Sequence, residues 1–279
     1  MTNCKYEEGG VLTRILVIGA AGRMGRTIIS CIEDTPGVEV SGGTESPGNP
    51  SVGSDMGELA GIGKKNILVG DCLETAVKAC DVIIDFTSPD SSMQTLAAAV
   101  KEIKPLVIGT TGFSASQKQL IRQASKKNRC VMAPNMSIGV NVLFKVVRDM
   151  AEALGDAYDV EIVEAHHKFK KDAPSGTAVR ISEIVADALN RNIDEVGVYG
   201  RKGITERTPK EIGVHTLRAG DIVGEHRVLF GGLGENLEIF HRAQSRATFA
   251  RGAVRAARWL VNQPVGLYDM QDVLGFRRK

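Results

Sequence analysis

A stretch of seventeen residues, 161–177, brings together side chains that can exchange protons and bind anions. An apolar run leads into the paired histidines His166 and His167. A loop containing Lys170 follows, and Ser175-Gly176-Thr177 opens a helical pattern. Histidine exchanges protons near neutral pH, and lysine adds mobile positive charge. A helix N-terminus offers unpaired N–H groups and the positive end of the helix dipole, which attract carboxylate or phosphate.

Each of these residues also has an ordinary structural explanation. Basic loops are usually solvated, a lone histidine can be a hydrogen-bonded edge residue, and serine is a common N-cap. Their combination within a few positions, leading into a helix, favours the functional interpretation. The sequence therefore predicts a pocket for a small anion with a proton donor beside it.

Composition limits the class of protein. A chain of 279 residues is long enough for two domains with real cores, and its 43% apolar content is ordinary for a soluble globular protein. The 35 basic and 33 acidic residues nearly balance, and aromatic residues make up only 5%. We therefore expect neither nucleic-acid binding nor attachment to a membrane surface. No apolar run approaches the roughly 20 residues that a membrane helix needs.

The cysteines indicate the compartment. Their number is odd, their spacing is wide and no CxxC pair occurs (Cys4, Cys31, Cys72, Cys80 and Cys130). This predicts free thiols in a reducing cytoplasm, with no disulfide framework and no metal site. Residues 1–13 lack the basic start and apolar centre of a signal peptide, so we expect a ragged leader there.

The residues from Arg14 onward show the pattern of a dinucleotide site. A short, continuously apolar run ends in Gly19-Ala-Ala-Gly22-Arg-Met-Gly25, and a helical pattern follows. Glycines in such a turn let the backbone close on a pyrophosphate at the helix N-terminus. The spacing is one residue wider than the usual fingerprint. Glu45, at the end of the next predicted strand (38–44), stands where an acid would bind the adenosine ribose.

Strand and helix signals then alternate up to Asn135, after a polar, glycine-rich segment (46–63) that we interpret as loop. Predicted strands are 67–69, 82–87, 105–108 and 129–133; predicted helices are 73–80, one through 97–100, and 114–128. This alternation predicts a Rossmann-like, doubly wound parallel sheet in an α/β protein. Ligands bind outside the carboxyl ends of such strands, where Phe86-Thr87, Gly109-Thr110-Thr111 and Ala133 to Met136 follow.

The pattern changes after Asn135. A long amphipathic helix, 139–154, leads to a second domain in which 159–165, 214–217, 225–230 and 237–241 look like strands without intervening helices. We therefore expect an α+β domain on a mixed or antiparallel sheet. Residues 191–212 are polar and contain glycines, as in a long surface arm. The predicted boundaries are 14–135 for dinucleotide binding and 136–245 for substrate binding and oligomerisation, with 246–279 packing back onto the first domain.

Longer motifs recur in a fixed order. They are Val-Ile-Gly-Ala-Ala-Gly-Arg-Met-Gly, Asp-Phe-Thr-Ser-Pro, Val-Ile-Gly-Thr-Thr-Gly-Phe, Asn-Met-Ser-Ile-Gly-Val-Asn, Glu-Ala-His-His-Lys-Phe-Lys-Lys-Asp-Ala-Pro-Ser-Gly-Thr and Arg-Ala-Gly-Asp-Ile-Val-Gly-Glu-His. Through them the chain resembles the 4-hydroxy-tetrahydrodipicolinate reductase (dihydrodipicolinate reductase) family of lysine and diaminopimelate biosynthesis, from about Arg14 to about Leu274. The Ser-Gly-Thr motif after paired histidines is specific to that family, whereas the glycine turn alone is not.

The resemblance implies hydride transfer from NADH or NADPH to a dicarboxylate, giving tetrahydrodipicolinate, in a homotetramer built through the substrate-domain sheets. By position it implies cofactor contacts from Gly19, Ala20, Ala21, Gly22, Arg23, Met24, Glu45, Gly109, Thr110, Thr111, Ala133, Pro134, Asn135 and Met136. His166 and Lys170 match the family's catalytic proton donors. His167, Gly176 and Thr177 match its contacts to the substrate carboxylate.

The chain departs from the family pattern at positions that bear on the cofactor. Relatives that favour NADPH often carry a basic residue directly after the ribose acid, where this chain has Ser46, and another basic residue where it has Ser88. Glu45 would repel a 2′-phosphate, so NADH is the predicted preference, with NADPH usable. Arg23, Lys64 and Lys65 are the nearby cations that could weaken it. Phe169 replaces a frequent histidine and receives no chemical role.

Two other functions are compatible with a dinucleotide site. Another two-domain NAD(P) oxidoreductase would show activity with a different substrate, although the Ser-Gly-Thr loop argues against it. A non-enzymatic dinucleotide sensor would have a broken histidine–lysine set, and here that set is intact. Kinetics with NADH and NADPH, with and without the pathway substrate, discriminate between these possibilities.

Overall fold

The computed structural model describes residues 12–277. Cys4 and all but the last two residues of the predicted leader lie outside this range, as do the final two residues of the chain. Contacts within the chain divide the described residues into two compact units, 12–133 with 249–277 and 134–248. Each unit has its own sheet and is described by itself.

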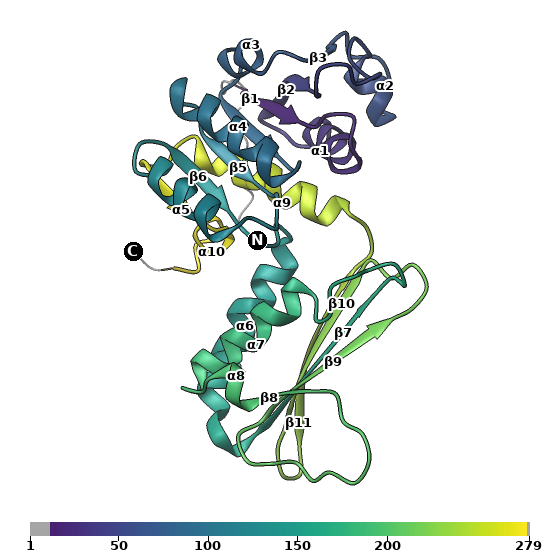
Figure 1. Ribbon diagram of the computed structural model, residues 1–279, viewed down its shortest axis with the longest axis vertical. Helices are drawn as coiled ribbons and strands as arrows, with labels where there is room; N and C mark the ends of the chain where they lie inside the picture. Colours follow the sequence, from purple (N-terminus) through teal and green to yellow (C-terminus); the bar gives the residue numbers. More distant parts are fainter. Residues whose placement is uncertain (1–11, 278–279) are drawn as a thin grey trace, which may run out of the picture. The chain divides into compact units, whose positions relative to one another are not determined.

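The first unit is built on a seven-stranded sheet in which neighbouring strands are parallel (Figure 1). In spatial order the strands are β12 (Gly266–Tyr268), β6 (Arg129–Met132), β5 (Leu106–Ile108), β4 (Val82–Asp85), β1 (Thr13–Ile18), β2 (Val38–Thr44) and β3 (Val69–Gly70). Its helices are α1 (Arg23–Glu33), α2 (Met56–Ala60), α3 (Leu73–Lys78), α4 (Pro89–Lys101), α5 (Ala115–Ala124), most of α9 (Ala247–Leu260) and α10 (Met270–Val273).

The central strands of this sheet are short apolar runs because they are buried from both sides. Leu16, Ile83 and Leu106 are fully buried and pack in one apolar cluster with residues of α3, α4 and α5. Burial of this kind contributes about 25 cal/mol per Å² of apolar surface removed from water. The predicted doubly wound parallel sheet is confirmed.

The second strand coincides with the predicted residues 38–44, but several other elements differ from the sequence prediction. The segment 46–63, interpreted as loop, contains α2, which begins because the Asp55 side chain accepts hydrogen bonds from the Gly57 and Glu58 N–H groups. The predicted strand 67–69 is reduced to the two residues of β3. The edge strand β12 was not predicted.

The second unit carries a five-stranded mixed sheet in the order β11 (Asn236–Ala243), β10 (Gly224–Gly231), β7 (Asp159–His166), β9 (Ile212–Arg218), β8 (Gly197–Tyr199). β10 is antiparallel to both β11 and β7, whereas β7, β9 and β8 are parallel. The predicted mixed sheet is confirmed. The expectation of strands without intervening helices is wrong for β7 and β9, because parallel strands need a crossover and α7 (Gly176–Ala188) lies between them.

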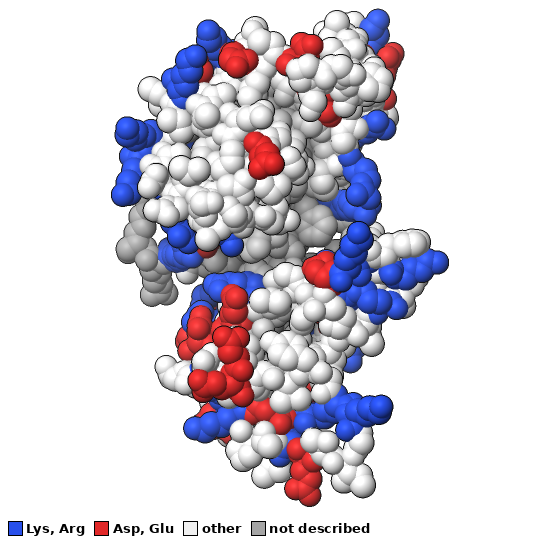
Figure 2. Space-filling view, viewed as in Figure 1, with Lys and Arg blue, Asp and Glu red and all other residues white. Residues whose placement is uncertain are grey.

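Two helices cover one face of this sheet within the second unit (Figure 1). α6 (Ile138–Leu154) and α7 pack Val147, Ile181 and Val185 against Ile162, Val214 and other sheet residues. α6 is followed by a short 3-10 helix, Gly155–Ala157. Arg148 on α6 reaches Glu152 and, across the helix pair, Asp187. Figure 2 shows acidic side chains gathered on this helical side of the unit.

The predicted surface arm, residues 191–212, is more structured than expected. It contains α8 (Ile193–Val196) and β8, which joins the sheet beside β9. Glu211 is only 4% exposed and accepts hydrogen bonds from Thr208. The polar composition of the arm therefore reflects a network of ion pairs and hydrogen bonds.

Candidate active site

The glycine turn between β1 and α1 has the form that an anion requires. Gly19 has a φ of +69°, which favours glycine, and a Cβ at Gly25 would overlap the Gly19 carbonyl oxygen. Gly22 is the N-cap of α1, provides no side-chain cap, and is followed by a first turn without acidic residues. The first turn of α1 therefore keeps N–H donors and a positive dipole end that no acidic side chain of that turn offsets, as a phosphate site requires.

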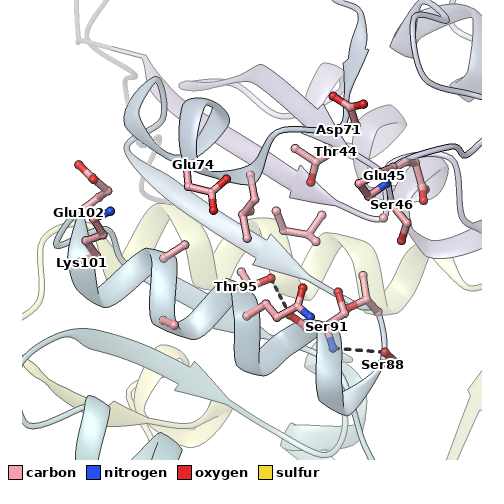
Figure 3. Close-up of a pocket in the computed structure, with 18 residues that line it drawn as sticks. Thr44, Glu45, Ser46, Asp71, Glu74, Ser88, Ser91, Thr95, Lys101 and Glu102 are labelled. Atoms are coloured by element: carbon pink, nitrogen blue, oxygen red, sulfur yellow. Dashed lines mark hydrogen bonds between the residues drawn. The ribbon is translucent and has the colours of Figure 1, made fainter.

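A cavity of about 780 Å³ lies beside this turn in the first unit. Its wall includes Ile18 and Gly19 at the end of β1, Thr44 to Pro47 at the end of β2, Thr87 and Ser88 after β4, and one face of α4 (Figure 3). These segments follow the carboxyl ends of neighbouring parallel strands, where α/β sheets bind ligands. The cavity lies where the sequence predicts the adenosine half of a dinucleotide.

Glu45 is fixed at the wall of this cavity. Its Oε1 accepts a hydrogen bond from the Ala21 N–H at 2.9 Å, and its Oε2 accepts one from Asn49 Nδ2 at 3.0 Å. Each carboxylate oxygen keeps a second lone pair, so Glu45 can also accept bonds from ribose hydroxyls. Asn49 was not predicted; its position inside a glycine- and proline-rich segment gave no signal of a partner for Glu45.

The charges around the cavity are mostly negative. Glu45, Asp71, Glu74 and Glu102 line it, and Lys101 is the one cation among the lining residues. Figure 3 shows Lys101 at the end of the cavity away from Glu45 and Ser46. Of the nearby cations that the sequence suggested, Lys65 is ion-paired with Glu33, and none of Arg23, Lys64 and Lys65 lines the cavity.

A buried hydroxyl network holds the ends of β4 and β5 together. The Asp85 carboxylate is fully buried and accepts hydrogen bonds from the N–H (2.9 Å) and the hydroxyl (2.6 Å) of Thr87. Ser92 donates to Thr110 at 2.8 Å, and Thr110 lies 3.4 Å from Asp85. The Thr110 hydroxyl is therefore hydrogen-bonded to other side chains of the protein.

The other predicted cofactor residues of this region differ in access. Thr111 is exposed, whereas Ala133 and Met136 are buried at 3% and 2%. A Cβ at Gly109 would overlap the ring of Phe86, which explains the glycine there.

Asn135 connects two sets of predicted residues within the second unit. Its Nδ2 donates to Thr177 Oγ1 at 3.1 Å, and its Oδ1 accepts from the Ser137 N–H at 2.8 Å. Asn135 was predicted beside the cofactor and Thr177 beside the substrate carboxylate. Their hydrogen bond brings these two residues together at the start of α7.

His166 ends β7 in a largely enclosed position, with a side chain only 12% exposed. Its Nδ1 lies 2.6 Å from Glu164 Oε2. Burial lowers the pKa of His166 below its ordinary value, and the neighbouring Glu164 carboxylate opposes this shift without reversing it. The imidazole is therefore neutral at neutral pH in the absence of a ligand.

The basic loop after β7 places Lys170 beside an acid. Lys170 Nζ lies 2.8 Å from Asp172 Oδ1. Burial tends to raise the pKa of Asp172, but the hydrogen bond and positive charge of Lys170 outweigh it and hold that pKa low. Because Asp172 is exposed, this pair is weak and an anionic ligand can compete for the lysine. Phe169 is 76% exposed and has no polar group to contribute.

The buried Nδ1 of His167 has no hydrogen-bond partner among the described residues. A buried polar atom without a partner is costly, and a ligand that supplied the partner would remove that cost. This supports the predicted ligand contact at His167.

The start of α7 has the features of an anion-binding helix N-terminus. Ser175 is its N-cap and accepts a hydrogen bond from the Ala178 N–H at 3.2 Å. Gly176 and Thr177 form the first turn, which carries no acidic side chain. The Ser175 hydroxyl also lies 3.2 Å from Nε2 of the buried His226. Burial lowers the pKa of His226 to about 3, so this residue adds no charge to the site.

Glu164, Arg218 and His226 belong to the site, although the sequence assigned them no role. Arg218 NH1 and NH2 each lie 2.9 Å from Glu164, and the His226 and His166 rings meet edge to face at 5.3 Å. Glu164 was detectable in principle: Val160, Ile162, Glu164 and His166 alternate along one face of a strand, and an acid among apolar neighbours on that face is unusual.

The predicted residues thus fall into one set in each unit. Gly19 to Met24, Glu45, Gly109 to Thr111 and Ala133 lie in the first unit. Pro134 to Met136, His166, His167, Lys170, Gly176 and Thr177 lie in the second. Among residues 12–277, no cluster of histidine, cysteine and acidic side chains could hold a metal ion. In the same range, no helix has the length and apolar character needed to span a membrane.

Comparison with known proteins identifies the family. Residues 13–136 match the family model of the dihydrodipicolinate reductase N-terminus, and residues 139–274 match that of its C-terminus. The chain is 54% identical over 267 residues to 4-hydroxy-tetrahydrodipicolinate reductase of Syntrophus aciditrophicus and 53% identical to that of Hahella chejuensis. Each alignment covers 95% of this chain and 100% of the relative.

The fold agrees with that of a solved member. Dipicolinate-bound dihydrodipicolinate reductase from Paenisporosarcina sp. TG-14 superposes with a TM-score of 0.74 at 23% identity, covering 94% of this chain and 99% of that one. Both family halves, in order and at full length, are therefore present. The chain belongs to the dihydrodipicolinate reductase family of nicotinamide-dependent oxidoreductases.

Proposed function

We propose that the chain carries out its family's reaction, the reduction of 4-hydroxy-tetrahydrodipicolinate to tetrahydrodipicolinate in lysine and diaminopimelate biosynthesis. One observation carries the assignment of roles: a neutral, carboxylate-bound histidine, a loop lysine and an open helix N-terminus occur together in the second unit. The first unit, 12–133 with 249–277, binds the cofactor, and the unit 134–248 binds the substrate.

The first unit's residues hold the dinucleotide. The N–H groups from Gly19 to Met24 bind the pyrophosphate, and Glu45 accepts hydrogen bonds from the adenosine ribose. Gly109 to Thr111 and Ala133 contact the nicotinamide; the other predicted nicotinamide contacts, Pro134 to Met136, belong to the second unit. The uncapped start of α1 and the cavity beside it support the pyrophosphate and ribose contacts. When bound, the reduced nicotinamide supplies the hydride.

The second unit's residues hold the substrate and manage the proton. One carboxylate sits on the N–H groups of Gly176 and Thr177, while Lys170 and His167 offset the other negative charge. A hydride added to an unsaturated ring carbon leaves negative charge on the neighbouring atoms, and a proton must neutralise it. His166, once protonated on both ring nitrogens, and Lys170 are the acids that deliver that proton.

The anion site is tested with pyridine-2,6-dicarboxylate, a planar dianion that resembles the product. We expect it to compete with the substrate. Lys170→Ala should weaken its inhibition roughly ten-fold, and should raise KM and lower kcat. Lys171→Ala removes the same charge from the next, exposed residue and should change neither. Equal inhibition of both variants would show that the dianion binds elsewhere.

We further propose that NADH is preferred and NADPH is usable. Glu45 lies with Asp71 and Glu74 around the adenosine cavity, and Ser46 and Ser88 line it without positive charge. A 2′-phosphate near one such carboxylate costs about 1 kcal/mol in water-like surroundings, which corresponds to roughly five-fold in specificity.

The test compares kcat/KM for the two cofactors. Ser46→Arg should shift the ratio toward NADPH, and raising the salt concentration should narrow the unmodified protein's preference. Ser116→Arg adds the same charge on the exposed side of α5 and should leave the ratio unchanged. A higher kcat/KM for NADPH in the unmodified protein would contradict the proposal.

A homotetramer formed through the second unit's sheet is our proposal for the assembly. Within that unit the helices pack on one sheet face, and the other face carries exposed Leu217 and Phe240, with Arg227 and Arg242 over the Phe240 ring. Apolar residues rimmed by charges are typical of interfaces. Phe240→Glu should reduce the mass measured by sedimentation.

We place the enzyme in the cytoplasm, in keeping with four free cysteines among the described residues.

A further inference from the structure

Glu164 is a fully buried carboxylate at the centre of the second unit's site. Its Oε2 lies 2.6 Å from His166 Nδ1 and accepts from Arg218 NH1 at 2.9 Å. Its Oε1 accepts from Arg218 NH2 and from the Ser175 N–H, both at 2.9 Å, and from Thr216 at 3.3 Å. One side chain thus joins the histidine at the end of β7, the arginine at the end of β9 and the N-cap of α7.

The Glu164 carboxylate is ionised. Burial by itself raises the pKa of this group, but hydrogen bonds from Arg218, His166 and the Ser175 N–H outweigh it and hold the pKa low. The two guanidinium contacts of Arg218 are a bidentate pair, which supplies the positive charge that a buried carboxylate needs.

An ionised carboxylate can only accept hydrogen bonds, so His166 must donate through Nδ1. The neutral ring then carries its proton on Nδ1 and leaves Nε2 as the second, exchangeable position. Nε2 points toward Gly224, where a Cβ would lie only 3.1 Å from it. The absence of a side chain at Gly224 therefore leaves room beside the nitrogen that is free to exchange a proton.

We propose that Glu164 is a positioning residue: it fixes the tautomer of His166, so that Nε2 delivers the proton, and also holds the start of α7 where the substrate carboxylate binds. The inference rests on the proposed role of His166 as proton donor. A proton leaving Nε2 of the imidazolium yields the same neutral tautomer that Glu164 stabilises. No rearrangement of the ring is then needed between turnovers.

The groups around His166 are consistent with this arrangement. Glu164 faces it from its own strand, Arg218 from β9 and His226 from β10, and Lys170 contributes positive charge from the loop, partly offset by Asp172. His226 stays neutral above a pH of about 3, so it does not compete for the proton. Glu164 is the one carboxylate in direct contact with His166 among the described residues.

The test replaces Glu164 with glutamine, which keeps the shape and removes the charge. Its amide can donate to Nδ1 and favour the other tautomer. We expect kcat of Glu164→Gln to fall on the order of 100-fold, within the range of general acid catalysis. The limb of the kcat–pH profile due to His166 should move to lower pH, because the imidazolium loses the neighbouring negative charge of Glu164 that stabilises it. A purely structural role would lower stability and leave that limb in place.

The matched control is Glu161→Gln. Glu161 lies on the same strand and also contacts a histidine, His215, at 2.7 Å and the arginines Arg201 and Arg207, but it is outside the proposed site. Loss of its charge should affect stability and not the pH profile of kcat. If both variants shift the profile equally, or Glu164→Gln leaves kcat and the profile unchanged, the inference is wrong.

A measurement on the unmodified enzyme keeps the inference testable if Glu164→Gln does not fold. Nitrogen-15 NMR of the five histidines reports which ring nitrogen carries the proton, and the His166 signals are those lost in His166→Gln. We expect the Nδ1–H form for His166 at a pH where it is neutral. Finding the Nε2–H form would overturn the inference. An unchanged kcat in His166→Gln would instead refute the proposed function.

Discussion

Two clusters, each built around a glutamate of strand β7, contain the same three residue types. The Glu164 cluster consists of Glu164, His166 and Arg218; the Glu161 cluster consists of Glu161, His215, Arg201 and Arg207. Because successive side chains of a strand point to opposite faces, Glu161 and Glu164 belong to different faces of the sheet. The side chain of Glu164 is fully buried, whereas that of Glu161 is 22% exposed.

The two clusters differ in what surrounds them. The Glu164 cluster lies at the carboxyl ends of β7 and β9, beside the start of α7 and the Lys170 loop. In the Glu161 cluster both arginines also reach Glu211, and these contacts tie the arm of residues 191–212 to the sheet. Residue types alone therefore do not mark a catalytic site. Burial and the adjacent start of α7 distinguish the cluster that we propose to be catalytic from the structural one.

The largest difference should appear when each cluster loses its histidine. His166→Gln should reduce kcat by about 10²–10³-fold, because general acid catalysis contributes on this scale, and cofactor binding should change little. His215→Gln should alter kcat less than about two-fold, within the range of a remote change. Stopped-flow or steady-state assays of the paired variants measure this contrast. A near-normal kcat in His166→Gln would remove the distinction between the clusters.

Acid sensitivity provides the next largest effect. The folded-state pKa of His226 is about 3, against an ordinary value of 6.5, so the unfolded chain binds more protons between these values. Stability should therefore fall as the pH drops below 6.5, by at most about 3 kcal/mol down to pH 4.5 for this one group. Burial acts in the same direction on His166 and His241.

Carboxylates whose pKa lies below the ordinary value, such as Glu161 and Glu164, also destabilise the fold in acid. They lose stabilisation only below about pH 4.5, where carboxylates of the unfolded chain take up protons. Denaturant unfolding of His226→Gln between pH 4.5 and 6.5 isolates the histidine. We expect the slope of stability against pH to become shallower, and an unchanged slope would contradict the assignment.

The smallest effects are expected when a glycine beside each cluster is replaced by alanine. A Cβ at Gly224 lies 3.1 Å from His166 Nε2, so the ring must move by a few tenths of an ångström. Gly224→Ala should lower kcat by about three- to ten-fold, since catalysis depends on such positioning. A Cβ at Gly213 overlaps the Glu161 carboxylate, which must leave His215. Gly213→Ala should cost about 1 kcal/mol of stability without affecting kcat.

Paired measurements of kcat and thermal unfolding test this separation. Each variant should change one property and spare the other. If Gly213→Ala lowers kcat as much as Gly224→Ala does, the Glu161 cluster contributes to catalysis and the comparison fails.

Much of the first unit was predictable because its strands are continuous apolar runs bounded by glycines. The first strand, β1, whose apolar residues 15–18 lead directly into Gly19, is one example. β12 was missed because three residues carry little periodic signal, and its pairing with β6 depends on residues far apart in the sequence. α2 was missed because its five residues lie among glycine and proline, and its N-cap, Asp55, is an ordinary loop residue.

The proposed site follows from the sequence where one short motif contains it. His166, Lys170 and Ser175-Gly176-Thr177 are neighbours in the chain, and the family resemblance supplied their roles. Arg218 lies more than fifty residues away and reaches Glu164 only through the parallel register of β7 and β9. That register brings His166 opposite Arg218 and cannot be read from either strand alone.

The order of segments along the chain has a consequence for its synthesis. β6 pairs with β5 on one side and with β12 on the other, and β12 lies close to the C-terminus. The entire second unit leaves the ribosome between these two strands. At 5–20 residues per second, about 130 intervening residues delay β12 by on the order of 10 s. Throughout that interval the outer edge of β6 is open to incorrect strand pairing. The sheet of the first unit is therefore complete only after the C-terminal segment has been synthesised.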